Sequence, residues 1–216
     1  PIQAAMTAAA ITGRNIFFPS GSYVVTQTLN CAPIVIFANN DASIVFDGLA
    51  GSDGIVFASS SSVGRYVGAT GLTLICKGSN GGTCLKTAAD SSQYFTYNTK
   101  YVFTNLFCRG FDRNEAGYAN CWSTGFETWI DVGDCVGAFV SNLVIQGAFN
   151  IKEDPSSQLQ DTGIRLSANA TMLTARMQNL EIGPIYNAVL VGNNAFFSLN
   201  AFDFVGTFNG VAQEEG

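Results

Sequence analysis

The chain has 216 residues, of which 47% are hydrophobic and only 12% charged, so it buries a large core and is neither a disordered polyampholyte nor a solvated coiled coil. Its net charge of -6, its 10 Lys plus Arg and its lack of any apolar run of about 20 residues argue against nucleic acid and against membrane insertion. The sequence has no His, so acid–base chemistry would fall to carboxylates, Lys, Arg or Tyr.

The first predicted element is a short N-terminal helix within residues 1–13. Ile2, Met6 and Ala9 recur at helical spacing, and the surrounding Ala-rich sequence favours a helix. Gly13 provides a residue that stops it. We expect this helix to cap the domain that follows.

After Gly13 the pattern changes to short runs rich in β-branched and aromatic residues, separated by Gly, Asn, Asp and Ser. These runs predict β-strands that follow one another closely. The first four lie over Asn15–Phe18, Ser22–Thr26, Ile34–Phe37 and Ser43–Phe46.

A short sequence unit then recurs along the chain: a Gly, Asn or Ala followed by an alternating apolar strand. The spacings between the first apolar positions of successive units are 34, 37, 37 and 22 residues. Periods of about 20 to 50 residues are typical of solenoids. These first apolar positions are Leu72, Leu106, Leu143, Leu180 and Phe202.

The alternation within each unit turns one side of the strand inward and the other outward, and the Asn and Gly residues tolerate the left-handed conformation needed at a corner. Stacked coils would bury the inward residues against each other. We therefore expect an all-β fold, a right-handed parallel β-helix over residues 14–216. An antiparallel β-sandwich or barrel is the structural alternative, because the same short strands could build it.

The six cysteines form an even set without CxxC spacing. We interpret most of them as small buried thiols, with a disulfide framework as the alternative. Cys76 and Cys84, which flank a Gly-rich turn, would be the local pair to form if any does.

A family resemblance rests on the first thirty residues or so. The helix, followed by Gly13–Val25 with its Phe18-Pro19-Ser20-Gly21-Ser22-Tyr23 turn, resembles the start of pectate-lyase-like β-helix domains. Such domains are common in bacteriophage tailspikes and in some secreted polysaccharide-degrading enzymes. The downstream units agree with this family only generically.

The resemblance implies a phage tailspike or receptor-binding protein, located in the virion, that binds and depolymerises a bacterial capsule or O-antigen as a glycoside hydrolase or polysaccharide lyase. It also implies a homotrimer that contacts other tail proteins. The alternatives are a non-catalytic tail component and a secreted microbial cell-wall polysaccharidase. Calcium-dependent pectate lyases would show Asp-rich metal ligands with a basic residue, and this chain has no clear match, so we expect neither a metal nor another cofactor.

The longest excursion between units, residues 111–134, holds both tryptophans of the chain. Alternation within it places Glu127, Trp129 and Asp131 on one strand face, and an outward face would present an aromatic platform flanked by carboxylates. Because sugar rings stack on aromatic faces, this platform predicts a carbohydrate surface. The alternative is that Trp129 packs beneath a loop or in a subunit interface. The predicted carbohydrate-binding residues are Trp129, Trp122 and Tyr118.

Glycoside hydrolysis needs two carboxyl groups about 5 to 9.5 Å apart. Glu127 and Asp131 lie about 13 Å apart along a strand, so each would need a partner from another segment. A lyase would instead need a base such as Arg109 or Tyr118, and spacing selects none. The alternative for each of these residues is an ordinary solvated charge. The predicted catalytic residues are Glu127, Asp131, Asp112 and Glu115, with Glu153, Asp154 and Asp161 as further partners.

A solenoid needs a cap at each end, because its open ends would expose the core and unpaired strand edges. The N-terminal helix provides one cap, whereas the sequence stops directly after a strand unit. We therefore expect the natural protein to continue beyond Gly216.

Overall fold

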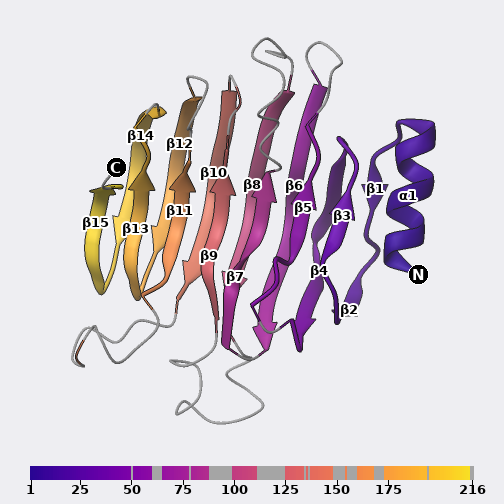
Figure 1. Ribbon diagram of the computed structural model, residues 1–216, viewed down its shortest axis with the longest axis horizontal. Coiled ribbons are helices and arrows are strands. Elements are labelled where there is room, and N and C mark those ends of the chain that lie inside the picture. Colours follow the sequence, from indigo (N-terminus) through magenta and orange to yellow (C-terminus); the bar gives the residue numbers. More distant parts are fainter. Residues whose placement is uncertain are drawn as a thin grey trace.

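The computed structural model describes residues 1–49, 51–59, 65–77, 79–87, 99–110, 125–133, 135, 137–147, 154, 160–167, 173–193 and 195–214. It confirms the N-terminal helix, α1 (Ile2–Thr12), which ends at Gly13 in the left-handed conformation with φ of 66°. The remaining described elements are β-strands that belong to two sheets (Figure 1).

The first sheet, called sheet A, contains eight strands. They are β1 (Ile16–Phe17), β2 (Gly21–Val25), β4 (Val35–Asp47), β6 (Arg65–Lys77), β8 (Thr99–Arg109), β10 (Gly137–Gln146), β12 (Leu173–Ile182) and β14 (Ala195–Phe204). Sheet B contains β3 (Leu29–Cys31), β5 (Ile55–Phe57), β7 (Ser79–Thr87), β9 (Gly125–Val132), β11 (Thr162–Leu166), β13 (Ile185–Val191) and β15 (Thr207–Gln213).

The strands from β3 to β15 alternate between the two sheets in chain order, and each pairs in parallel with the next strand of its own sheet. The chain therefore passes from one sheet to the other and back, adding one strand to each sheet per circuit. This arrangement is consistent with a parallel β-helix. The antiparallel sandwich or barrel is wrong, because every described strand pair is parallel.

The strand register confirms the sequence repeat. Leu106 pairs with Leu143, Leu143 with Leu180, and Leu180 with Phe202. The flanking pairs of β6 and β8 place Leu72 opposite Leu106. The repeat spacing varies because the segments between successive sheet A strands differ in length. The repeat units themselves remain in register.

The sheet A strands β6, β8, β10, β12 and β14 each have a corner at the residue that opens the repeat unit. Asn105, Asn142 and Asn179 have φ of 54°, 50° and 54°, and Gly71 and Ala201 occupy the same corner with φ of 70° and 52°. The three asparagines form a ladder along the solenoid: each successive Nδ2 donates to the previous Oδ1 at 2.9 Å. The amides thus stabilise the corner both by tolerating its conformation and by linking the coils.

One detail of the predicted strands is wrong. The runs Ile34–Phe37 and Ser43–Phe46 were expected as separate strands, yet both belong to β4. The strand bends between them at Asn40, whose φ is 65°, and its register against β6 shifts there. The sequence pattern therefore breaks at the corner residue Asn40, although β4 continues through it.

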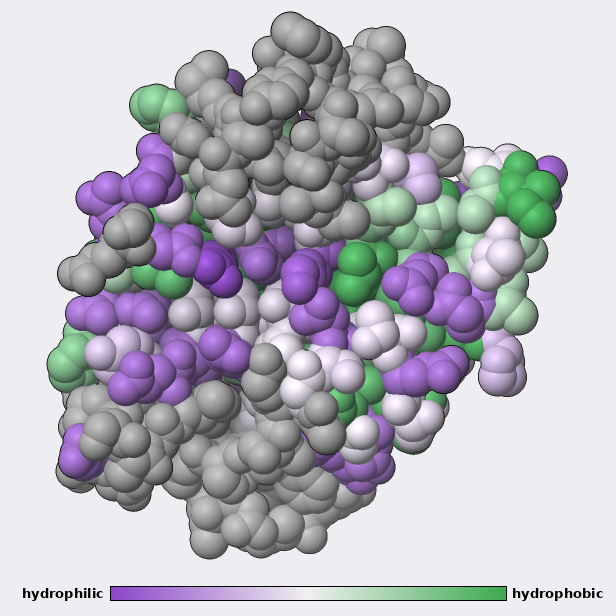
Figure 2. All heavy atoms as spheres, viewed as in Figure 1, coloured by the Kyte–Doolittle hydropathy of each residue, from purple (hydrophilic) through white to green (hydrophobic). Residues whose placement is uncertain are grey.

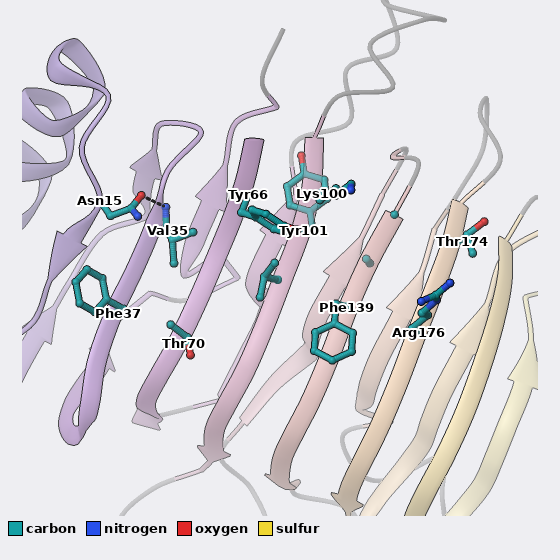
Figure 3. Close-up of a pocket in the computed structure, with 13 residues that line it drawn as sticks. Asn15, Val35, Phe37, Tyr66, Thr70, Lys100, Tyr101, Phe139, Thr174 and Arg176 are labelled. Atoms are coloured by element: carbon teal, nitrogen blue, oxygen red, sulfur yellow. Dashed lines mark hydrogen bonds between the residues drawn. The ribbon is translucent and has the colours of Figure 1, made fainter. Parts of the chain in front are cut away.

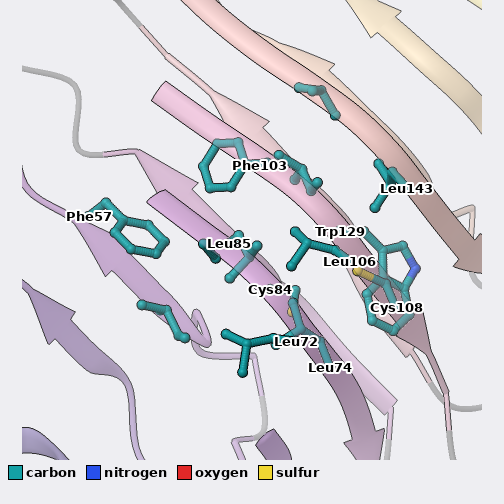
Figure 4. Close-up of a cluster of buried hydrophobic side chains, with 14 of the residues drawn as sticks. Phe57, Leu72, Leu74, Cys84, Leu85, Phe103, Leu106, Cys108, Trp129 and Leu143 are labelled. Carbon is teal, nitrogen blue, oxygen red and sulfur yellow. The ribbon is translucent and has the colours of Figure 1, made fainter. Parts of the chain in front are cut away.

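The inward side chains of both sheets form one continuous hydrophobic core. Leu74, Leu106 and Leu143 from sheet A belong to the same buried cluster as Leu85 from sheet B (Figure 4), and all four are at most 2% exposed. Burial of each such side chain contributes about 1.5 to 3 kcal/mol. The core is therefore the main source of stability.

The cysteines are part of this core. Five of them, at positions 31, 76, 84, 108 and 135, are buried thiols that form no disulfide, as expected for most of the set. The local Cys76–Cys84 disulfide is therefore absent, and Cys121 lies outside the described residues. Burial raises the pKa of Cys31 to about 12 and also raises the pKa of Cys84 and Cys108.

Helix α1 packs against β1 and β3 at the N-terminal end of the sheets (Figure 1). The Gln3 side chain pairs with the backbone of Asn30 on the edge strand β3: Nε2 donates to its carbonyl and Oε1 accepts from its N–H, both at 2.9 Å. Met6 on the same helix is fully buried. The helix therefore covers this end of the core and satisfies part of an exposed strand edge.

Candidate functional site

The expected outward orientation of Trp129 is wrong. Its side chain is 0% exposed and lies in the core close to Leu106 and Cys108 (Figure 4). The Phe126 ring meets it edge-on, with ring centroids 5.6 Å apart. Strict alternation would place residues three apart on opposite faces, yet both rings are fully buried and in contact, so the alternation does not hold between Phe126 and Trp129. Trp129 therefore presents no platform to a sugar.

Asp131 lies in a charged network on the outer face of sheet B. It is 8% exposed, it accepts a hydrogen bond from Ser167, and it pairs across the strands with Lys86 and Arg165. Burial raises the pKa of its carboxyl, although Ser167 and the two cations act in the opposite direction. The hydrogen bond and the two cations partly offset the desolvation cost of this nearly buried carboxylate.

The same network extends to both sides of Asp131. Lys86 Nζ lies 2.9 Å from Asp53 Oδ2, and Arg165 pairs with Glu214. Charges of opposite sign thus alternate from Asp53 through Lys86 and Asp131 to Arg165, and such cross-strand pairs stabilise neighbouring strands. We interpret Asp131 as a structural residue here, and its catalytic role stays a prediction.

Of the other predicted catalytic and carbohydrate-binding residues, only Glu127 and Trp129 lie in the part of the chain that the structure describes. Glu127 is exposed, while Asp112, Glu115, Tyr118 and Trp122 lie outside the described residues. Their roles therefore stay predictions. Of the further partners, Asp161 is fully buried and accepts a hydrogen bond from the Tyr186 N–H at 3.2 Å, which makes it a support for the backbone.

A site that the sequence did not reveal lies on the outer face of sheet A. There an open groove of about 880 Å³ crosses several neighbouring strands, in the halves of the strands that precede the asparagine corner. Figure 3 shows its side chains projecting from successive parallel strands. Four of them carry its chemistry: Tyr66, Lys100, Phe139 and Arg176.

These four residues form two pairs of the same kind. Tyr66 on β6 lies opposite Lys100 on β8, and Phe139 on β10 lies opposite Arg176 on β12. The aromatic rings are accessible, with Tyr66 56% and Phe139 37% exposed. The Lys100 ammonium lies 5.9 Å from the centre of the Tyr66 ring, close enough for a cation–π contact.

The groove carries positive charge on a chain whose net charge is -6. Its described lining contains Lys100 and Arg176 but no Asp or Glu. Carboxylates of sheet A, such as Glu181 and Asp203, line a separate hollow beyond the asparagine corner. The half of sheet A beyond the corner therefore carries carboxylates that the described groove lining lacks, together with the cations Lys77 and Arg109.

Gly137 keeps the centre of the groove open. It lies on β10, opposite Lys100, and a Cβ built there would meet no atom within 4 Å. The hollow therefore exists partly because this position has no side chain. A larger residue would fill it without a backbone clash.

The sequence could not reveal this groove, because its residues are spread over strands whose repeat spacings are 34 and 37 residues. The useful signal is an aromatic residue in one repeat aligned with a cation in the next. That alignment becomes visible when outward positions are counted back from the corner residue of each repeat, and the strand register agrees with it.

The surface has a mixed character on the face drawn in Figure 2. Hydrophobic residues gather toward the end that carries α1 and β1, and hydrophilic residues occupy much of the centre. Within the described ranges, no helix is long and apolar enough to cross a membrane. The described residues also contain no cluster of three or more Cys, Asp or Glu placed to hold a metal ion.

Comparisons of the chain with protein-family models, with curated proteins and with solved structures found no match.

Proposed function

We propose that this chain is a right-handed parallel β-helix that binds a bacterial surface polysaccharide along the sheet A groove, as a phage tailspike or receptor-binding protein does. The observation that carries the proposal is the pair of accessible rings, Tyr66 and Phe139, on one open face. Aromatic faces offer a rigid apolar surface on which a sugar ring can stack. A groove that crosses several strands suits a chain of sugars better than a single sugar.

Binding is supported more strongly than cleavage. The described groove lining has no carboxylate, and Asp131 lies on the other sheet within its own network. Hydrolysis would need two carboxyl groups about 5 to 9.5 Å apart. Depolymerisation is therefore a second, separate part of the proposal. It would require catalytic groups from the predicted excursion at residues 111–134.

The tail location and the homotrimer are also proposals, carried by the N-terminal resemblance. Assembly can be tested directly, because a trimer would have three times the chain mass of 22.8 kDa in light scattering at micromolar concentration. A monodisperse monomer in solution would contradict the trimer.

The binding proposal is tested with immobilised bacterial capsular and O-antigen polysaccharides. We expect the chain to be retained on at least one of them, and a Tyr66→Ala, Phe139→Ala double variant to lose retention. Phe208→Ala is the matched control, because that ring is 51% exposed but lies on β15 of sheet B. Retention by none of the polysaccharides, or equal retention of the double variant, would contradict the proposal.

A second variant tests the same groove without removing an aromatic ring. Gly137→Leu adds a side chain where the structure has open space, so the fold should be kept while the groove is filled. We expect weaker retention with an unchanged unfolding midpoint. Release of reducing ends from the retained polysaccharide then tests depolymerisation separately.

A further inference from the structure

The two aromatic–cation pairs of the groove are repeated at a fixed displacement. The Tyr66–Lys100 pair occupies β6 and β8, and the Phe139–Arg176 pair occupies β10 and β12. Neighbouring strands lie about 4.8 Å apart, so corresponding members are about 10 Å apart along the solenoid axis. The second pair is also shifted along the strands: Lys100 lies opposite Gly137, which is two residues, or about 7 Å, before Phe139. The two perpendicular shifts combine to a displacement of about 12 Å between the pairs.

The cations of these pairs are available for a ligand. Lys100 and Arg176 are both exposed, and neither forms an ion pair with another residue in the described part of the chain. No carboxylate in the described lining neutralises them. A cation without a carboxylate partner at the wall of an apolar groove favours an anion, and an Arg guanidinium can hold a carboxylate through two hydrogen bonds.

We infer that the groove selects an acidic polysaccharide whose carboxylates recur about once per disaccharide. This inference rests on the proposed polysaccharide binding and names its substrate class. At each pair, one sugar ring stacks on Tyr66 or Phe139 while a carboxylate meets Lys100 or Arg176. The displacement of about 12 Å is comparable to the length of a disaccharide, whereas a single sugar is shorter.

The same geometry sets the direction of the ligand. The two pairs are separated mainly across the strands, so the sugar chain runs mainly along the solenoid axis. An oligosaccharide long enough to reach both pairs gains the second contact as an intramolecular event, which raises its affinity steeply. We therefore expect affinity to increase sharply at the length that first carries two carboxylates.

The test uses hyaluronan oligosaccharides, which alternate a hexuronate with an uncharged aminosugar, and the full chain. The comparison ligands are the same oligosaccharides after carboxyl reduction, and neutral dextran oligomers of equal length. We expect binding of hyaluronan octasaccharide by calorimetry, at least tenfold weaker binding of its carboxyl-reduced form, and affinity that falls as salt rises.

Variants connect this selectivity to the two cations. Lys100→Gln and Arg176→Gln should each weaken hyaluronan binding at least fivefold and reduce its salt dependence. Lys77→Gln is the charge-matched control, because Lys77 lies on β6 but lines a different hollow. At the open position, Gly137→Glu should weaken binding more than Gly137→Gln, since the two side chains differ only in charge.

The outcomes separate this inference from the proposed function. Equal binding of hyaluronan, its carboxyl-reduced form and dextran would overturn the acidic selectivity but leave polysaccharide binding in place. Binding of neutral bacterial polysaccharides without any acidic one would do the same. A chain that binds neither hyaluronan nor any bacterial polysaccharide would overturn both.

Discussion

The asparagine ladder can be tested by comparing how much alanine and glycine substitutions at one of its positions destabilise the fold. Asn142 is the middle member: its Nδ2 donates to Asn105, and its Oδ1 accepts from Asn179, each at 2.9 Å. Its φ of 50° lies in the left-handed region. Asn142→Ala therefore removes two hydrogen bonds and places a less suitable residue in a strained conformation.

The expected cost can be worked from these two terms. Each hydrogen bond is exposed to solvent and contributes about 0.5 to 1 kcal/mol, at the lower end of the usual range. Alanine in the left-handed conformation costs about 1 to 2 kcal/mol. We expect Asn142→Ala to lower the free energy of unfolding by about 2 to 4 kcal/mol.

Asn142→Gly separates the two terms, because glycine loses the same hydrogen bonds but tolerates positive φ. We expect glycine to be about 1 kcal/mol less destabilising than alanine, the reverse of their order inside an ordinary strand. Urea unfolding followed by far-ultraviolet circular dichroism measures both variants. The reasoning is refuted if glycine destabilises more than alanine, or if alanine changes the unfolding free energy by less than about 0.5 kcal/mol.

Three further predictions concern the ladder end, Asp131 and the thiols. Ala201→Asn, opposite Asn179, should extend the ladder and stabilise the chain by about 1 kcal/mol in urea unfolding; no change would contradict it. The raised pKa of Asp131 means that its ionised form costs stability, a cost absent below the ordinary value of 3.8 and complete above the folded-state pKa. The stability of Asp131→Asn relative to the natural chain should therefore increase as pH rises through that window, and a decrease would show the opposite shift. Iodoacetamide at pH 8 should leave the five described thiols unmodified in the folded chain and alkylate them in urea; mass spectrometry that finds rapid alkylation of native Cys84 would contradict their burial.

The repeat architecture could be predicted from the sequence because each unit carries its own local signals. The alternation around Leu106, Leu143 and Leu180 set the inward face, and the asparagine before each leucine marked the corner. These signals require no knowledge of distant contacts. The helix was predictable for the same reason, since Gly13 ends it locally.

The site could not be predicted, because it depends on contacts between strands. Simple alternation places Trp129 outward, whereas its side chain is fully buried in the core against Phe126. The groove depends on Tyr66 lying opposite Lys100 and Phe139 lying opposite Arg176, and only the strand register brings those residues together. A repeat alignment that compared outward positions would have shown both pairs.

Polysaccharide binding by the sheet A groove is tested most directly by retention of the chain on a panel of bacterial surface polysaccharides. We predict that the natural chain is retained by at least one acidic polysaccharide and that the Tyr66→Ala, Phe139→Ala double variant is released. Retention by none, or retention that survives loss of both rings while the fold is intact, would contradict it.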